Sequence, residues 1–431
     1  MKIAVDIDDT LNIVDRAGRA GGYIARKGLP FHLKDPDANQ FVNVFDWTQD
    51  DVLQFIRDGG ISAFTEAEAR PYAREALEGW REEGHTVVIL TARPKEWFGN
   101  PVNLSRDWLE KRRIPFDEIV AECTDKGRYC AEHGISVLVD DTFETCRAAQ
   151  RLGVRAVLAV GKHNRARASE IAFCGSNWKQ IDERVRRILQ EEELEELLAR
   201  ACPAKRCERY DGWELRMDEG TSYRNRCVAP MSPSLTGFGE KIFVCEERYR
   251  AENKPCVFRL TASDLPLDKF LEARGYPVVK NCEVMVLEKI PVFFRTQNCS
   301  VYFSLSEEWL KEFYLLDDAD SDYADSVRSG FSLVGGPCIY VALREGEKTV
   351  AVCMGVQEGD TVGLFDLRVH PEYRRRGYGR AVCERVLAEA KRAGARRAYL
   401  AVRCSNAAAI ALYRSLGFER AYLYWYRAKE K

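Results

Sequence analysis

The sequence of 431 residues has little of what marks several common protein classes. It contains no run of about eighteen apolar residues, the length that a membrane-spanning helix requires. Its 65 lysines and arginines are offset by 67 aspartates and glutamates, so no basic surplus favours nucleic acid as a partner. The chain leads from Met1 directly into an apolar strand rather than into a signal peptide. We therefore expect a cytoplasmic protein that binds small-molecule substrates and has neither a membrane nor a nucleic-acid partner.

Residues suited to a zinc site are also scarce. The 15 cysteines include no Cys-x-x-Cys pair, and only 5 histidines are present. A structural zinc ion requires four convergent ligands, and Cys202 and Cys207 are a weak candidate pair with no further ligands nearby. We expect the cysteines to be reduced and mostly buried.

A glycine-containing turn near the C-terminus is the most informative feature that the sequence does contain. An apolar strand ending near Val369 runs into a basic turn with Gly377 and Gly379, and a helix follows. Glycine lets the backbone pass close to an anion, and the N–H groups of the first helical turn point at it. The pattern predicts a site for the pyrophosphate of a cofactor, formed by Leu367, Val369, Arg374, Arg375, Gly377, Tyr378, Gly379 and Arg380.

This segment resembles the acetyl-CoA signature of the Gcn5-related N-acetyltransferases (GNAT), in which Arg/Gln-x-x-Gly-x-Gly/Ala follows a strand. The helix expected from Asn406 to Tyr413, with Gly417 and Phe418 after it, matches the family's Asn-x-x-Ala-x-x-Leu-Tyr element. The resemblance implies that acetyl-CoA, or another acyl-CoA, is a cosubstrate and that Asn406 helps to bind it. It also implies that Tyr413 protonates the departing thiolate, which a phenol of pKa about 10 can do. The alternative is that Tyr413 is a packed core aromatic.

Two parts of the acyl-transfer chemistry depend on the strand before the glycine turn. If this strand splays from its neighbour, backbone N–H groups near Val369 are free to polarise a thioester carbonyl. No residue stands out as the general base. Asp366 and Glu358 are candidates, and ordered water could also take the proton of the amine.

Acidic residues gather at the end of the first expected strand. Lys2 to Ile7 is apolar apart from its first residue and Asp6, and Asp8, Asp9 and Thr10 follow. Because side chains alternate along a strand, Asp6 and Asp8 project from the same side, so that one can attack while the other handles protons. Their mutual repulsion is costly unless they bind a cation or perform chemistry.

Three further elements would meet this acidic strand end in a doubly wound sheet. One strand ends at Thr91, Lys126 begins a helix after another, and a third strand ends at Asp140 and Asp141. All of them would open at the carboxyl edge of the sheet, where such folds bind ligands.

The order of these elements resembles the haloacid dehalogenase (HAD) superfamily of phosphohydrolases, and their placing looks like the cytosolic deoxyribonucleotidase type. The resemblance covers about residues 1–190. It implies that Asp6 is the nucleophile and that Asp8 acts as acid and base. It implies a Mg²⁺ site made by Asp6, the backbone carbonyl of Asp8, and Asp141, with Asp140 as a ligand through water or as a supporting neighbour. Thr91 and Lys126 would bind the phosphoryl oxygens.

The expected fold is α/β, with an N-terminal doubly wound parallel sheet followed by tandem GNAT-like mixed α/β domains. The ranges are 1–190 for the HAD-like phosphatase domain, with a helical cap at about 11–70, and 191–200 for a helical linker. Residues 201–290 form a degenerate GNAT-like or adaptor half without a glycine turn, and 291–431 form the catalytic GNAT domain. The cap aromatics Phe41, Phe45 and Trp47 could stack on a base, but a role in the core is preferred.

These features predict a bifunctional enzyme. One activity is a Mg²⁺-dependent phosphohydrolase of a small phosphorylated metabolite, and the other is an acyl-CoA-dependent N-acyltransferase on a small amine. The alternative is a single-activity acetyltransferase, acting on a small molecule or a protein, in which the N-terminal part binds a nucleotide or regulates without turnover. The oligomeric state stays open.

Overall fold

A computed structural model describes the chain except for residues 219–221, 293, 295–298, 317–320 and 430–431. The chain divides into two compact units. Unit 1 comprises Met1–Leu189, Pro230–Lys241 and Ser263–Leu267, and unit 2 comprises Gln190–Ala229, Ile242–Ala262 and Asp268–Lys431. Within the described ranges, no helix combines the length and the apolar character needed to cross a membrane.

Unit 1 is built on a six-stranded sheet in the order β5-β4-β1-β6-β7-β8. Its strands are β1 (Lys2–Val5), β4 (Thr86–Leu90), β5 (Glu118–Val120), β6 (Val137–Asp140), β7 (Arg155–Ala159) and β8 (Phe173–Gly175). Every pair of neighbours is parallel. The central strands are almost entirely apolar and buried, because helices cover both faces of the sheet. The expected doubly wound parallel sheet is confirmed.

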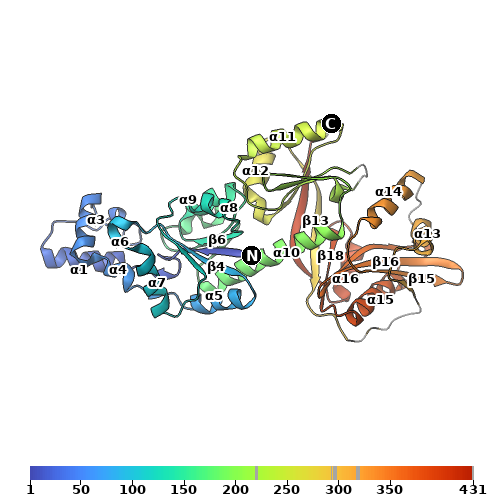
Figure 1. The fold of residues 1–431 in the computed structure, drawn as a ribbon, viewed down its shortest axis with the longest axis horizontal. Coiled ribbons are helices and arrows are strands. Elements are labelled where there is room, and N and C mark those ends of the chain that lie inside the picture. Colours follow the sequence, from blue (N-terminus) through green and yellow to red (C-terminus); the bar gives the residue numbers. More distant parts are fainter. Residues whose placement is uncertain (219–221, 293, 295–298, 317–320, 430–431) are drawn as a thin grey trace. The chain divides into compact units, whose positions relative to one another are not determined.

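Helices cover the sheet of unit 1 on two sides (Figure 1). Helices α8 (Lys126–Glu132) and α9 (Phe143–Arg151) lie on one side, and α5 (Ala73–Glu82) and α7 (Pro101–Lys111) lie on the other. The side chain of Asp125 accepts a hydrogen bond from the backbone N–H of Arg128 and so caps α8. This cap starts the helix at Lys126, at the carboxyl edge of the sheet.

The expected cap is present as an insertion between two short antiparallel strands, β2 (Asn12–Ile13) and β3 (Glu68–Ala69). The insertion holds α1 (Arg16–Lys27), α2 (Phe41–Val44), α3 (Gln49–Phe55), the π-helical turn η1 (Ile56–Gly60) and α4 (Ser62–Thr65). Phe41, Phe45 and Trp47 are buried in its own small core, and the rings of Phe45 and Trp47 stack with centroids 5.4 Å apart. Their predicted role in the core is confirmed.

Unit 2 is organised around one eleven-stranded sheet in the order β14-β15-β16-β17-β18-β13-β19-β12-β11-β10-β9. The strands are β9 (Cys207–Tyr210), β10 (Trp213–Arg216), β11 (Val228–Pro230), β12 (Val257–Thr261), β13 (Val278–Leu287), β14 (Ser300–Tyr302), β15 (Cys338–Glu345), β16 (Lys348–Glu358), β17 (Thr361–Val369), β18 (Arg397–Arg403) and β19 (Glu419–Ala428). Strand β13 pairs with β18 on one side and with β19 on the other. The expected boundary between residues 290 and 291 therefore separates strands that share one sheet, because β13 fills the place between two C-terminal strands.

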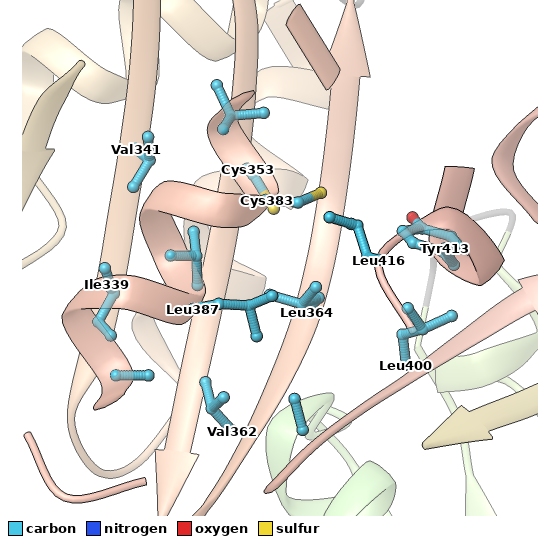
Figure 2. Packing of buried hydrophobic residues seen from close by; sticks show 14 of the residues in the cluster. Ile339, Val341, Cys353, Val362, Leu364, Cys383, Leu387, Leu400, Tyr413 and Leu416 are labelled. Atoms are coloured by element: carbon cyan, nitrogen blue, oxygen red, sulfur yellow. The ribbon is translucent and has the colours of Figure 1, made fainter. Parts of the chain in front are cut away.

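Alternating side chains give this sheet two separate cores. Val341, Leu364 and Leu400 face helices α15 (Tyr378–Arg392) and α16 (Ala407–Ser415), whereas Tyr340 and Phe365 face α13 (Glu307–Leu315) and α14 (Ser321–Ser332). Figure 2 shows the first of these cores, in which Leu416 and Leu400 lie beside Tyr413. The period-two alternation of β-strands explains why neighbouring residues serve opposite faces.

Three long helices complete the chain, namely α10 (Trp178–Ala201), α11 (Phe238–Ala251) and α12 (Leu265–Ala273). The expected linker at 191–200 is not a separate helix, since α10 continues through it without a break. All fifteen cysteines are free thiols, and nine of them are buried. This agrees with the expected reduced and mostly buried cysteines.

Candidate active sites

Three carboxylates of unit 1 converge at the carboxyl edge of the parallel sheet. Asp6 follows β1, Asp140 ends β6 and Asp141 follows it; each offers an oxygen, and these oxygens lie within 4.8 Å of one another. The ammonium of Lys126 lies between two of them, with Nζ 2.7 Å from Asp6 Oδ1 and 2.6 Å from Asp140 Oδ2. Burial lowers the pKa of Lys126, but the charges of Asp140 and Asp6 outweigh burial and raise it overall. Lys126 is therefore held as a cation.

One lysine does not balance three carboxylates. Burial raises the pKa of Asp6, Lys126 lowers it, and the charges of Asp140 and Asp141 raise it further. A bound divalent cation would relieve this repulsion. Magnesium prefers oxygen ligands of this kind, so the donor set fits Mg²⁺, with Asp6, Asp140 and Asp141 as the residues that could hold it.

The carboxylate of Asp8 lies outside this cluster because other side chains hold it. Arg93 donates two hydrogen bonds to it, Nε to Oδ2 at 2.8 Å and Nη2 to Oδ1 at 2.7 Å, and Asn12 donates a third at 3.0 Å. Burial raises the pKa of Asp8, but Arg93 and Asn12 outweigh burial and lower it overall. The carboxylate of Asp8 is thus not available as a metal ligand in this arrangement. The expected role of its backbone carbonyl stays a prediction.

A cavity of about 400 Å³ unites the predicted residues of unit 1. Its walls include Asp6, Asp8, Thr91, Lys126 and Asp141. The sixth predicted residue, Asp140, lies behind this wall and reaches it through Lys126. The cap closes the opposite side with a wall of mixed character made by Arg16, Asn39, Gln40, Phe41, Gln49 and Phe64. The cavity suits a small molecule that has a phosphate at one end.

Several residues of this site were missed by reasoning from the sequence. His163 Nε2 lies 3.0 Å from Asp141 Oδ2, and Asn164 donates to the backbone carbonyl of Asp141 at 2.6 Å. Burial lowers the pKa of His163, but the hydrogen bond to Asp141 and its charge raise it overall. Both residues lie in the loop after β7, and no local pattern marks them. Arg93 could have been found, because it stands two residues after Thr91 on the same strand end.

In unit 2, strand β17 separates from β18 as expected. The two strands pair in parallel only as far as Leu364 and Leu400, whereas β17 continues beside β16 to Val369. The register between β16 and β17 shifts beyond Phe365, and Asp366 there has a positive φ of 50°. The last residues of β17 therefore have no partner on the side of β18, which leaves a gap suited to a narrow ligand.

The glycine turn lies directly after this gap. Gly377 precedes α15 with φ 89°, a left-handed conformation that favours glycine. A Cβ at Gly379 would lie 3.2 Å from Val369 Cγ2 and 3.4 Å from Leu412 Cδ2, so the backbone is packed closely against β17 and α16. Arg374 and Arg375 are exposed before the first turn of α15. This arrangement fits a pyrophosphate on the helix N-terminus.

Two residues of the expected cofactor site use their side chains elsewhere. Arg380 donates to Glu384 at 2.8 Å and to the backbone oxygen of Ser415 at 3.1 Å, which ties α15 to the end of α16. The side chain of Asn406 accepts from the N–H of Ala409 and caps α16. In this structure Asn406 therefore positions the helix of Tyr413, and Arg380 can meet a phosphate only through its backbone N–H. Leu367 and Tyr378 are half-buried next to the turn.

Tyr413 is buried between α16 and the sheet, 6.0 Å from the ring of Phe418 (Figure 2). Burial raises the pKa of its phenol well above the ordinary value, and nearby Cys383 and Cys353 act in the same direction. The phenol therefore keeps its proton at neutral pH. This suits a proton donor and equally suits a core aromatic.

The two candidate bases are in different surroundings. Glu358 is exposed and accepts a hydrogen bond from Arg200 at 2.8 Å. Asp366 lines a cavity of about 220 Å³ at the splay, together with Phe365 and Met354 of the sheet. Residues from α13, α14 and the segment 201–225 close this cavity. Of the two candidates, Asp366 alone faces a space where an amine could lie.

Residues 302–418 match the profile of the acetyltransferase (GNAT) family. This match identifies a GNAT acetyltransferase domain within unit 2. It covers β17, the glycine turn, α15 and α16, and it ends before unit 1. The resemblance of residues 1–190 to HAD phosphohydrolases has no such support and stays a prediction.

Named relatives show the same tendency. The chain is 50% identical over 62 residues to the [ribosomal protein bS18]-alanine N-acetyltransferase of Escherichia coli K12, which is 14% of this chain and 42% of that relative. The chain thus spans less than half the length of this relative. It is 28% identical over 245 residues to the uncharacterized N-acetyltransferase YobR of Bacillus subtilis, which is 55% of this chain and 97% of that protein.

Two solved structures resemble part of the chain. One is a GCN5-related N-acetyltransferase from Kribbella flavida, with a TM-score of 0.44 and 16% identity over 57% of this chain and 95% of that one. The other is a tandem GNAT protein from the clavulanic acid biosynthesis pathway, with a TM-score of 0.39 and 14% identity over 47% of this chain and 75% of that one.

Proposed function

We propose that unit 2 is an N-acyltransferase that transfers the acyl group of acetyl-CoA, or a related acyl-CoA, to a small amine. The observation that carries this proposal is the splay of β17 from β18 directly before the glycine turn at Gly377. A pantetheine arm can enter the splay while the pyrophosphate binds at the N-terminus of α15. The family match over residues 302–418 supports the same reading.

In this proposal the backbone at the end of β17 performs most of the catalysis. Free N–H groups near Val369 polarise the thioester carbonyl, and the amine attacks from the cavity that Asp366 lines. A C–N bond forms, the C–S bond breaks, and Tyr413 donates its proton to the leaving thiolate. The proton of the amine leaves through Asp366 or through water.

Product analysis tests this activity. The full-length protein is incubated with radiolabelled acetyl-CoA and a panel of small amines, and labelled N-acetyl products are separated by chromatography. We expect amine-dependent product and one acetyl-CoA site per chain by calorimetry. Two equivalent sites would contradict the proposal that residues 201–290 lack a cofactor site.

A peptide acceptor is the competing possibility, because the Escherichia coli relative is named for ribosomal protein bS18. The segment 201–225 contributes Cys202, Ser222 and Asn225 to the wall of the acceptor cavity. A cavity of about 220 Å³ closed in this way favours a small acceptor over an extended peptide. Labelled protein in a peptide panel, with no labelled small amine, would reverse this preference.

We also propose that unit 1 is a phosphohydrolase of a small phosphorylated metabolite. The supporting observation is the buried cluster of Asp6, Asp140 and Asp141 with Lys126 between two of its members. Asp6 would attack phosphorus and form an aspartyl-phosphate, while Lys126 and Thr91 bind the phosphoryl oxygens. Asp8 would protonate the leaving oxygen and later activate water, once its contact with Arg93 loosens. Mg²⁺, when bound, would supply charge neutralisation at the phosphate.

Metal dependence tests the proposed hydrolysis. Phosphate release is measured from a panel of phosphorylated sugars, amines and nucleotides, with added Mg²⁺ or with EDTA. We expect release from at least one compound, and we expect EDTA to abolish it. If Mg²⁺-loaded protein binds nucleotides in calorimetry but releases no phosphate, unit 1 is a binding or regulatory module instead.

A further inference from the structure

An arginine that the reaction scheme does not use lies at the wall of the acceptor cavity. Arg224 belongs to the 3₁₀ turn η3 (Tyr223–Asn225) and is half-buried. Its Nη1 lies 3.4 Å from Cys202 Sγ, and its Cζ lies 5.9 Å from the centre of the Phe365 ring. Both contacted residues line the cavity. The guanidinium is therefore at the cavity wall, close to Asp366, whose charge raises the pKa of Arg224.

A lysine lies close to this arginine. Lys280, on β13, is half-buried with Nζ 4.4 Å from the centre of the Tyr223 ring and 5.8 Å from that of Tyr426. Burial lowers the pKa of Lys280, and the positive charges of Arg403 and Arg224 lower it further. The two side chains thus form one region of positive potential beside the splay.

Other arginines of unit 2 at similar depth have carboxylate partners. Arg427 binds Asp268 at 2.6 Å, and Arg216 binds Glu214 at 2.8 Å. Within the described parts of the chain, neither Arg224 nor Lys280 forms a salt bridge. Partial burial of two neighbouring cations without an anion is costly, and a bound anionic group would compensate it.

We propose that the acyl acceptor of unit 2 is an amine that also carries an anionic group, a carboxylate or a phosphate, and that Arg224 and Lys280 bind this group. The inference rests on the acyl transfer proposed above. A guanidinium can bind two oxygens of either anion, and the ammonium adds a point charge. Asp366 lines the same cavity and would attract the amine end, so the two charges of a compact zwitterion meet opposite charges of the protein.

Matched pairs of amines test this recognition in the unmodified protein. One pair is glycine and glycinamide, and the other is O-phosphoethanolamine and ethanolamine. We expect kcat/KM for acetyl transfer to be at least about tenfold higher for the anionic member of one pair, since a charged hydrogen bond contributes that much. The pair that responds distinguishes a carboxylate from a phosphate.

Two lysine variants show whether this preference comes from the proposed residues. Lys280→Met should remove the preference for the anionic amine and leave the KM for acetyl-CoA unchanged, whereas Lys280→Arg should retain it. The matched control is Lys429→Met, because Nζ of Lys429 also lies 4.4 Å from an aromatic ring centre, that of Tyr276, and removes the same charge. The control should keep the preference.

The failures of the two proposals are distinguishable. Acetyl transfer that is equal within both pairs, or a preference that survives in Lys280→Met, contradicts the anionic acceptor and leaves acyl transfer standing. Full-length protein that binds no acetyl-CoA in calorimetry overturns the acyl transfer itself, and the inference with it.

Discussion

The candidate sites of unit 1 and unit 2 are built from different parts of the polypeptide. In unit 1, charged side chains hold one another, as Lys126 does with Asp6 and Asp140. In unit 2, the backbone forms the site, through the separation of β17 from β18 and the left-handed Gly377. The first site therefore depends on which functional groups are present, and the second depends on where the backbone can go.

The difference follows from the charge that each proposed reaction moves. A transferring phosphoryl group carries several negative charges, which need buried cations and acids of set protonation. A thioester carbonyl is neutral and gains charge only in the transition state, where oriented N–H groups are sufficient. We therefore expect isosteric side-chain changes to inactivate unit 1 and small steric changes to inactivate unit 2.

The largest expected effect is in unit 1. Asp6→Asn keeps the shape but removes the nucleophile, so phosphate release should fall by roughly 10³-fold or more, while acetyl transfer is unchanged. Phosphate assays on both activities of the full chain measure this. Asp37→Asn is the control, because Asp37 is an exposed acid that binds Lys162 away from the cluster. Release that persists in Asp6→Asn would sink the covalent mechanism.

The next effect concerns proton donation in unit 2. Tyr413→Phe should lower kcat for acetyl transfer by about 10²–10⁴-fold with little change in the Kd of acetyl-CoA, because the phenol acts on a group that leaves in the transition state. Since burial raises the pKa of Tyr413, its deprotonation should not slow the wild-type reaction up to about pH 10.

A control separates this role from packing. Tyr340→Phe changes a buried tyrosine on the opposite face of the sheet and should leave kcat nearly unchanged. An unaltered rate in Tyr413→Phe would assign Tyr413 to the core.

A steric change tests the dependence of unit 2 on its backbone. Gly379→Val places atoms where even a Cβ would lie 3.2 Å from Val369, so β17 or α15 must shift. We expect the Kd of acetyl-CoA to rise by about 100-fold, as misplacement by about 1 Å can cost in positioned sites. Gly335→Ala is the matched control, since a Cβ there has no atom within 4 Å. Equal Kd values in both variants would show that the glycine turn does not hold the cofactor.

The smallest effect separates the fold of unit 1 from its site. The Asp117 carboxylate accepts from Arg81 and from the backbone N–H of Val87. Burial raises the pKa of Asp117, but these partners lower it overall, so its stabilisation is present above the unfolded value and is lost as pH falls through the folded one.

Asp117→Asn should therefore cost about 1–2 kcal/mol at pH 7 and much less near pH 3, as measured by urea unfolding. Phosphate release by the folded variant should be unchanged. A loss that is equal at both pH values would contradict the assigned ionisation.

Features with a strong local pattern could be predicted from the sequence. The strand Thr86–Leu90 is a continuous apolar run, and the turn at Gly377 joins a strand to a helix within a few residues. Features that depend on distant partners could not. Asn164 meets Asp141 across 23 positions of sequence, and no periodicity records that contact.

The roles of two predicted residues also depended on their surroundings. The residue types at Asn406 and Asp8 suit a cofactor contact and a metal site. In the folded chain Asn406 caps α16 and the Asp8 carboxylate is bound by Arg93. A residue type limits what a side chain can bind, but the nearest partner decides what it does bind.

The sequence by itself determined the parallel sheet of unit 1, the acidic strand end at Asp6 and the glycine turn of unit 2. Each of these follows from chain-local properties, namely apolar runs, side-chain alternation and the conformational freedom of glycine. Only the tertiary structure decided that β13 lies between β18 and β19, and that Arg224 and Lys280 meet beside the splay. Strand order and clusters of charge arise when segments far apart in sequence pack together, and local patterns carry no information on which segments will meet.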